Sequence, residues 1–211
     1  TEARATRILL EDGRATGVAY RKGKTDKTVR ARCEVILAAG AFQSPQILQL
    51  SGIGHSDDLR PHGIEVKHAL PGVGRNLQDH LDFTLSYRSQ SRDMFGVGPR
   101  ATLRLLNELR QWRRTGRSMA ASTFAEAGSF FKTDPCLDRP DVQTHFVTAL
   151  VENHARKLFW GYGYSCHVCV LRPFTRGTVT LQSANALDPP RIDPQFLSDE
   201  RDLATLVAGV R

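Results

Sequence analysis

The sequence lacks several features that would place a chain in a class at once. Its 211 residues include only four cysteines, scattered along the chain, so we expect no disulfide framework and a reducing compartment. No apolar run approaches the roughly 18 residues that a membrane-spanning helix needs, and the first residues show no signal-peptide pattern. The net charge of +7 is spread over most of the chain without a recognisable nucleic-acid module, so no nucleic-acid partner is expected.

What is present indicates a globular chain, with 40% hydrophobic and 24% charged residues. Short apolar runs on either side of Asp12-Gly13 and after Lys22-Gly23-Lys24 predict a small antiparallel meander at the start. The continuous apolar run Val35–Ala39 is typical of a strand that is buried on both faces in a parallel sheet.

Gly40 ends this run, and a glycine there lets the backbone approach a ligand closely. Ser44 and Pro45 then predict the N-cap and first residue of a helix, and Gly52 predicts its end. From these residues alone, two interpretations stay open. The segment is either an ordinary strand, loop and helix of an α/β domain or part of a cofactor site.

The run from Gly40 to Gly54 resembles the second signature of the glucose-methanol-choline (GMC) family of oxidoreductases. Three later stretches also resemble this family, and all four blocks stand in the family's order. The later stretches are Leu70 to Phe83, Arg172 to Ser183 and Pro190 to Arg211.

The resemblance implies an FAD-dependent enzyme that oxidises a primary alcohol, an aliphatic alcohol or choline, by hydride transfer to the flavin. Such enzymes hold the FAD pyrophosphate with an N-terminal G-x-G-x-x-G loop and carry a catalytic His near the C-terminus. The glycine loop is not expected here, because the nearest match, Gly72 to Leu77, lacks the third glycine. The resemblance places the catalytic His beyond the last residue of this sequence. We therefore expect an internal fragment without both ends, with no catalytic residue of its own, no bound FAD and no activity.

The expected fold class is α+β, a mainly antiparallel sheet with helices on one side, together with an incomplete piece of the FAD-binding domain. Residues 1–80 are the expected partial FAD-binding domain, and residues 81–211 the expected substrate-binding domain, truncated at its C-terminus. Helices are expected near 100–114 and 199–210. Alternating apolar positions predict the strands, at Phe83-Leu85-Tyr87, Val142-Thr144-Phe146, Cys166-Val168-Val170 and Val179-Leu181.

The resemblance also implies site residues. Those expected to contact FAD are Ala5, Ala39, Gly40 and Asn76. Glu126 matches a position that faces the substrate in the choline-oxidising branch, although relatives acting on uncharged alcohols share this Glu. His80 either pins its loop or, less simply, takes part in catalysis.

The substrate stays open between an aliphatic alcohol and choline, and the segment His145 to Pro173 resembles the enzymes that act on aliphatic alcohols. Its aromatic residues line an apolar channel or form ordinary core: Phe159, Trp160, Tyr162 and Tyr164. A hydroxynitrile lyase of the same family and a non-catalytic binding module are the alternative functions.

Two further patterns have alternative explanations. Cys166-His167-Val168-Cys169 suggests a metal, but alternation on a strand would point the two cysteines to opposite faces, so no metal site is expected. The arginine-rich helix at 99–117 either is solvated or lies on an anionic membrane surface. Oxygen and a membrane quinone stay open as electron acceptors, and the expected location is cytoplasmic, with peripheral attachment at the inner membrane as an alternative.

Overall fold

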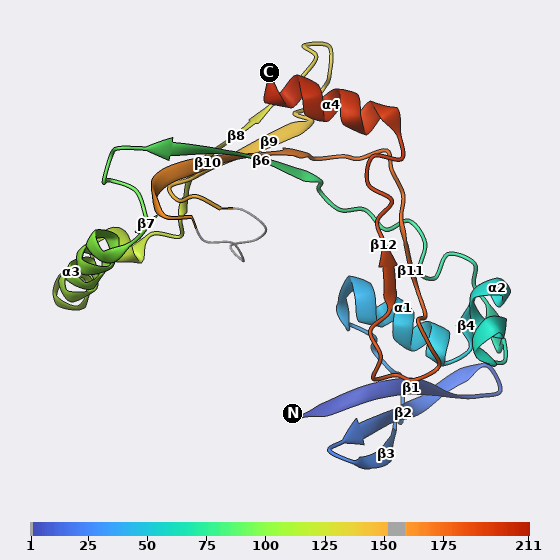
Figure 1. The fold of residues 1–211 in the computed structure, drawn as a ribbon. Coiled ribbons are helices and arrows are strands. Elements are labelled where there is room, and N and C mark those ends of the chain that lie inside the picture. Colours follow the sequence, from blue (N-terminus) through green and yellow to red (C-terminus); the bar gives the residue numbers. More distant parts are fainter. Residues whose placement is uncertain (1, 152–158) are drawn as a thin grey trace. The chain divides into compact units, whose positions relative to one another are not determined.

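The computed structural model describes residues 2–151 and 159–211 (Figure 1). The chain forms two compact units, Thr1–Asp79 with Thr175–Ser198, and His80–Phe174 with Asp199–Arg211. The chain therefore returns to the first unit late in the sequence. A division into residues 1–80 and 81–211 does not describe this return. Whether the two units are an FAD-binding and a substrate-binding domain stays a prediction.

The first unit begins with the expected meander. Strands β1 (Ala3–Glu11), β2 (Arg14–Lys22) and β3 (Thr25–Arg30) pair in that order, each antiparallel to the next. Gly13 and Gly23 lie at the two turns with φ of 76° and 60°, a backbone conformation that glycine adopts without strain. The turn residues therefore predicted this part correctly.

The strand expected at Val35–Ala39 is wrong, because this segment belongs to no strand or helix. Its side chains alternate between half-buried and exposed, and Ile36 is 80% exposed. A strand buried on both faces needs neighbours on both edges, and the described part of the chain supplies none.

Helix α1 (Gly40–Leu50) begins five residues before the expected start, with Ala39 as its N-cap and Pro45 inside the helix. The Oγ of Ser44 accepts a hydrogen bond of 3.1 Å from the N–H of Ala39, so Ser44 satisfies a backbone group from within the helix. The helix ends before Gly52 as expected, and Gly52 has φ of 85°.

The rest of the first unit consists of short elements that pack near α1. They are β4 (Ile53–Gly54), α2 (Ser56–Leu59), the 3₁₀ helix η1 (Arg60–His62), β5 (His68–Ala69), β11 (Thr178–Thr180) and β12 (Arg191–Asp193). β4 and β5 are parallel, whereas β11 and β12 form an antiparallel pair. The Nε2 of Gln49, which is fully buried on α1, donates to the carbonyl of Val179 at 2.9 Å and joins the β11–β12 hairpin to the helix.

The second unit contains the main antiparallel sheet, in the order β6-β10-β9-β8, with β7 paired to the end of β10. Its elements are β6 (Asp82–Ser89), β7 (Gly96–Val97), α3 (Pro99–Thr115), the 3₁₀ helix η2 (Met119–Ala121), β8 (Ala125–Phe131), β9 (Val142–Val147), β10 (Gly161–Val170) and α4 (Glu200–Val210). The strands expected at 83–87, 142–146 and 166–170 are confirmed, but Val179 lies in the separate β11–β12 pair. The mixed fold with antiparallel sheets is confirmed.

Both long helices form where expected. Helix α4 packs on β10 and β9, and its Leu206 closes a core cluster with Val142, Val168 and Val170. The exposed fractions of these four side chains are at most 7%, so the cluster is removed from water and stabilises the packing of α4 on the sheet. Helix α3 packs against β7 and η2.

Candidate functional site

The expected cofactor contacts all lie in the first unit. Ala5 is in β1 opposite Tyr20, immediately before a bulge between Ala5 and Arg7. Ala39 and Gly40 form the start of α1, and Asn76 lies in the loop after β5.

The start of α1 is open. Gly40 has φ of 81°, and a Cβ built there would meet nothing within 4 Å. Among the described residues, no side chain caps the helix through a hydrogen bond, and the first turn of the helix carries no acidic residue. The first N–H groups of a helix have no partners within the helix and carry partial positive charge, so this end suits an electron-rich ligand atom.

A pocket of about 470 Å³ brings Asn76 together with this helix. Its walls are Ala41, Ser44, Pro45 and Leu48 from α1 and the loop from Val73 to Gln78, with Val179 from the hairpin. Asn76 has φ of 62°, a left-handed conformation that Asn tolerates better than most residues. The expected contacts Gly40 and Asn76 therefore lie at or near one pocket, whereas Ala5 is not among its lining residues.

The expected residues fit recognition of a flavin through main-chain groups, because an open helix start stands next to a largely apolar pocket. The pyrophosphate loop expected of a flavoprotein is not found in this sequence. The described residues therefore fit only part of such a cofactor, and they do not include the loop that would hold its pyrophosphate.

Glu126 lies in the second unit, at a bulge of β8 between Ala125 and Ala127. Its Oε1 accepts a hydrogen bond of 2.7 Å from the hydroxyl of Ser122, and the residue is exposed. The carboxylate is thus held in place by a neighbour while it stays accessible to a ligand.

His80 is also in the second unit, where its Nε2 lies 3.0 Å from the carbonyl oxygen of Leu171. A hydrogen bond between the ring and this distant backbone group ties the loop to the segment that follows β10. This contact favours the loop-pinning interpretation over a catalytic one.

Cys166 and Cys169 are on β10, where alternation places them on opposite faces of the sheet. The Sγ of Cys169 donates to the carbonyl of Gln143 at 3.6 Å, and burial raises the pKa of this thiol. Among the described residues, no group of three or more His, Cys, Asp and Glu side chains could hold a metal ion.

The four aromatic residues at 159–164 do not gather around one space. Tyr164 packs against Tyr87 and Phe146 on the sheet, with ring centroids 5.3 and 5.2 Å away. Trp160 is 69% exposed, and Phe159 lines a separate apolar pocket. Of the two interpretations, ordinary core packing fits Tyr164, whereas Phe159 lines an apolar pocket.

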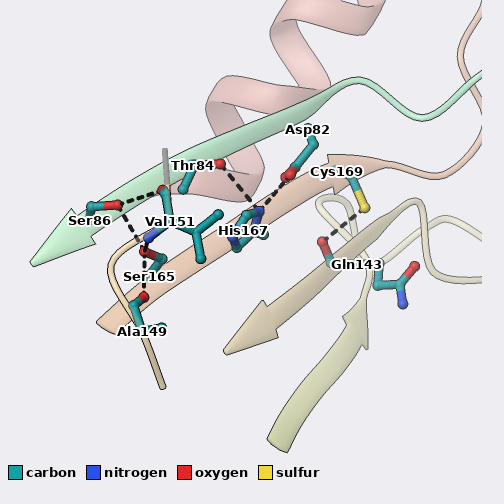
Figure 2. A network of polar contacts seen from close by, with 9 residues as sticks. All are labelled: Asp82, Thr84, Ser86, Gln143, Ala149, Val151, Ser165, His167 and Cys169. Atoms are coloured by element: carbon teal, nitrogen blue, oxygen red, sulfur yellow. Dashed lines mark hydrogen bonds and ion pairs between the residues drawn. The ribbon is translucent and has the colours of Figure 1, made fainter. Parts of the chain in front are cut away.

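A polar network that was not predicted from the sequence lies on the sheet face opposite α4 (Figure 2). Asp82 and Thr84 on β6 both contact His167 on β10, and Ser165 contacts Ser86, Ala149 and Val151. A signal was present, because polar residues alternate with apolar ones along both strands. Only the register of β6 against β10 shows which of them meet.

The described part of the chain contains no helix long and apolar enough to cross a membrane.

Residues 1–82 and 173–211 match two family models, both described as GMC oxidoreductase, and together they cover more than half of the chain. An alcohol dehydrogenase [acceptor] from Pseudomonas putida is 44% identical over the whole chain, which spans 39% of that protein. The mitochondrial choline dehydrogenase of Homo sapiens is 38% identical over 96% of the chain, which matches 34% of that protein. The chain thus spans well under half the length of the curated relatives it matches.

Solved structures agree on the fold. A formate oxidase superposes on the whole chain with a TM-score of 0.87 at 23% identity, and the match covers 42% of that protein. A pyridoxine 4-oxidase from Mesorbium loti superposes on 99% of the chain with a TM-score of 0.78 at 25% identity, and the match covers 37% of that protein.

Proposed function

The chain belongs to the GMC oxidoreductase family, and we propose that the whole protein of which it forms part is an FAD-dependent enzyme that oxidises a primary alcohol to the aldehyde. The geometric observation that carries the proposal is the pocket where Asn76 meets the open start of α1. The flavin would accept a hydride from the alcohol carbon.

Residues of this chain would bind and orient rather than transfer protons. Ala5, Ala39, Gly40 and Asn76 would contact the cofactor, the first three through main-chain groups. The first unit, in which Thr175–Ser198 joins the N-terminal residues, would be part of the FAD-binding domain, and the second unit would be most of the substrate-binding domain. The acid-base residue would come from another part of the whole protein, so the 211-residue chain alone would bind no FAD and have no activity.

The alcohol substrate would be an uncharged aliphatic alcohol in preference to choline. The 44% identity to an alcohol dehydrogenase over the whole chain, against 38% for the choline dehydrogenase, supports this preference. Glu126 would lie beside the substrate, and its accessible carboxylate, bonded to Ser122, is also compatible with a cationic alcohol.

The electron acceptor would be a quinone in a membrane, reached from a peripheral position. Helix α3 supports this part of the proposal, because apolar and arginine side chains are exposed together along it.

The first experiment expresses the whole protein and follows the flavin absorbance while 1-octanol, ethanol and choline are added without oxygen. The proposal expects a bound flavin that is bleached by 1-octanol. A flavin that stays oxidised with every alcohol, together with cyanide release from a cyanohydrin, would instead identify a hydroxynitrile lyase.

A second experiment tests the cofactor contact. Asn76→Gly keeps the left-handed backbone but removes the side chain, so it should lower FAD affinity without unfolding the loop. Asn107→Gly on the exposed side of α3 is the control for loss of an Asn side chain. Equal FAD affinity in the wild type and the Asn76 variant would remove Asn76 from the site.

A further inference from the structure

The second unit contains an apolar pocket of about 470 Å³ that is distinct from the pocket beside α1. It lies among β7, α3, the residue before β8, the segment after β9 and the start of β10. Among the described residues that line it, none has a charged or polar side chain. The walls used below are Phe95, Leu105, Phe124, Ala149, Leu150 and Phe159.

Backbone hydrogen bonds fix the position of two of these walls. The N–H of Phe95 donates to the carbonyl of Thr148 at 2.8 Å, and the N–H of Thr148 donates to the carbonyl of Phe124 at 3.0 Å. The two phenylalanine rings therefore stand side by side, with centroids 4.2 Å apart. The pocket wall is held by this frame before any ligand binds.

The backbone of Phe124 is unusual. Its φ of 67° is a left-handed conformation that is unfavourable for a bulky side chain. The N–H of Phe124 donates to the Oγ of Ser122 at 3.0 Å, and the same hydroxyl donates to Glu126 at 2.7 Å. These hydrogen bonds hold the turn in place, and Phe124 is 47% exposed. The strained turn therefore places the aromatic ring at the pocket and not in the core.

We propose that this pocket binds the neutral hydrocarbon chain of a primary alcohol, an inference that rests on the proposed function and narrows its substrate class. Its volume lies within the range of small-molecule sites, roughly 300–1,000 Å³. Its described walls offer a ligand no hydrogen-bonding side chain, so the group that gains most there is an alkyl chain.

The three phenylalanines also suggest another ligand group, the trimethylammonium of choline, since aromatic faces attract cations. Phenylalanine is not the strongest partner for this interaction, and within the described part of the chain no carboxylate lines the pocket to balance a buried positive charge. The lining therefore favours a neutral chain over choline.

The test uses the whole FAD-loaded protein and measures binding apart from turnover. Tertiary alcohols such as 2-methyl-2-octanol lack the carbinol hydrogen that an oxidation removes, so their dissociation constants can be measured by calorimetry without reaction. Affinity should rise about fourfold for each added methylene until the pocket is full. With the flavin reduced beforehand, so that neither primary alcohol is oxidised, the neutral analogue 3,3-dimethyl-1-butanol should compete with the tertiary alcohol better than choline, which has nearly the same shape.

Two variants that fill the pocket from different elements should each weaken binding of the longest tertiary alcohol by about tenfold. These are Ala149→Leu, from the segment after β9, and Leu105→Trp, from α3. Ala204→Leu, on the exposed side of α4, is the control and should leave the affinity unchanged. Thermal unfolding of each variant shows whether a loss of affinity reflects a loss of fold.

The outcomes separate this inference from the proposed function. Unchanged affinity in both filled variants, or tighter binding of choline than of its neutral analogue, overturns the alkyl pocket even if the enzyme oxidises alcohols. Weakened binding in both folded variants supports the pocket, even if no primary alcohol reduces the flavin and the proposed function fails.

Discussion

The carboxylate of Asp82 lies 2.6 Å from Nδ1 of His167, a contact that joins the start of β6 to the middle of β10 (Figure 2). Thr84 Oγ1 lies 3.2 Å from the same nitrogen. Within the described residues, the other ring nitrogen is buried and has no hydrogen-bond partner. The carboxylate thus supports an imidazole that lies mostly inside the protein.

Asp82→Ala should lower the free energy of unfolding by about 1 kcal/mol, a value kept small because the Asp82 side chain is 41% exposed. Chemical denaturation checks this. Asp138→Ala, whose side chain is 89% exposed, is the matched control and should have almost no effect. Equal stabilities of the two variants would show that the contact to His167 does not stabilise the fold.

The return of the β11–β12 hairpin to the first unit depends on Gly74. A Cβ there would lie 2.1 Å from the carbonyl oxygen of Val179 and 2.5 Å from Nε2 of Gln49, and φ is 75°. Gly74→Ala should therefore cost more than about 2 kcal/mol, because backbone must move. Gly72→Ala, where a Cβ would meet nothing within 4 Å, should change the stability little. Faster limited proteolysis between residues 175 and 198 in the Gly74 variant alone would confirm the difference.

These two contacts show how far the sequence could predict the structure. Turn residues predict the β1–β3 meander, and apolar alternation predicts β6, β9 and β10, because both signals are local. The pairing of His167 with Asp82 depends on the register between strands 85 residues apart. The hairpin at Val179 belongs to the first unit through Gln49, a residue 130 positions away. Neither contact has a local signal.

The two local predictions that were wrong have physical reasons. Val35–Ala39 is apolar enough for a central strand, but the described residues provide no neighbouring strand. Ser44 and Pro45 are typical of a helix start, yet Ser44 bonds to Ala39 from inside a helix that starts at Gly40. In the candidate site, the sequence could predict that Gly40 and Asn76 lie near the same ligand. It could not predict the strained turn at Phe124, since no sequence pattern indicates a positive φ at a phenylalanine.

The N-cap of α4 should give the protein a pH-dependent stability. The side chain and backbone N–H of Arg201 donate to Asp199 and lower the pKa of its carboxyl to about 2. A pKa lowered by folding stabilises the native state above the unfolded pKa of about 4, and this stabilisation is lost as the pH falls through about 2. Asp199→Asn keeps a good capping side chain but removes the charge.

The wild type should therefore unfold at a higher temperature than Asp199→Asn near neutral pH, and the difference should shrink as the pH falls toward 2. Thermal melts followed by circular dichroism measure it. Asp138→Asn is the control for a change of charge alone. A difference that stays constant with pH would mean that ionisation of Asp199 does not stabilise the helix.

Close packing of α4 on the sheet requires Gly209. A Cβ there would lie 2.9 and 3.0 Å from the two methyl groups of the buried Val142 and 3.2 Å from Val168. Gly209→Ala should cost about 1 kcal/mol through overpacking, although alanine favours a helix elsewhere. Val142→Ala alone should cost about 2 kcal/mol by leaving a cavity. The double variant should lose less than the sum, and additive losses in a double-mutant cycle would contradict direct packing.

Helix α3 exposes an apolar side that a soluble helix ordinarily buries. Leu105, Leu106, Leu109 and Trp112 are 38 to 48% exposed, and arginines neighbour them at Arg110, Arg113, Arg114 and Arg117. Leucine and tryptophan side chains can enter the interface of a bilayer while arginines contact anionic headgroups. Binding to vesicles should therefore need both anionic lipid and this helix.

In a cosedimentation assay with the whole protein, Arg113→Glu with Arg114→Glu should abolish most binding to anionic vesicles, because the two changes reverse the charge beside the apolar side. Lys24→Glu with Lys27→Glu, in the exposed β2–β3 turn region, changes the net charge equally and is the matched control. If both double variants lose binding alike, the attraction comes from the net charge of the protein. Undiminished binding of the α3 variant would exclude the helix as the contact. Loss of binding in the α3 variant alone, together with weaker binding of the wild type at high salt, would identify α3 as the membrane contact.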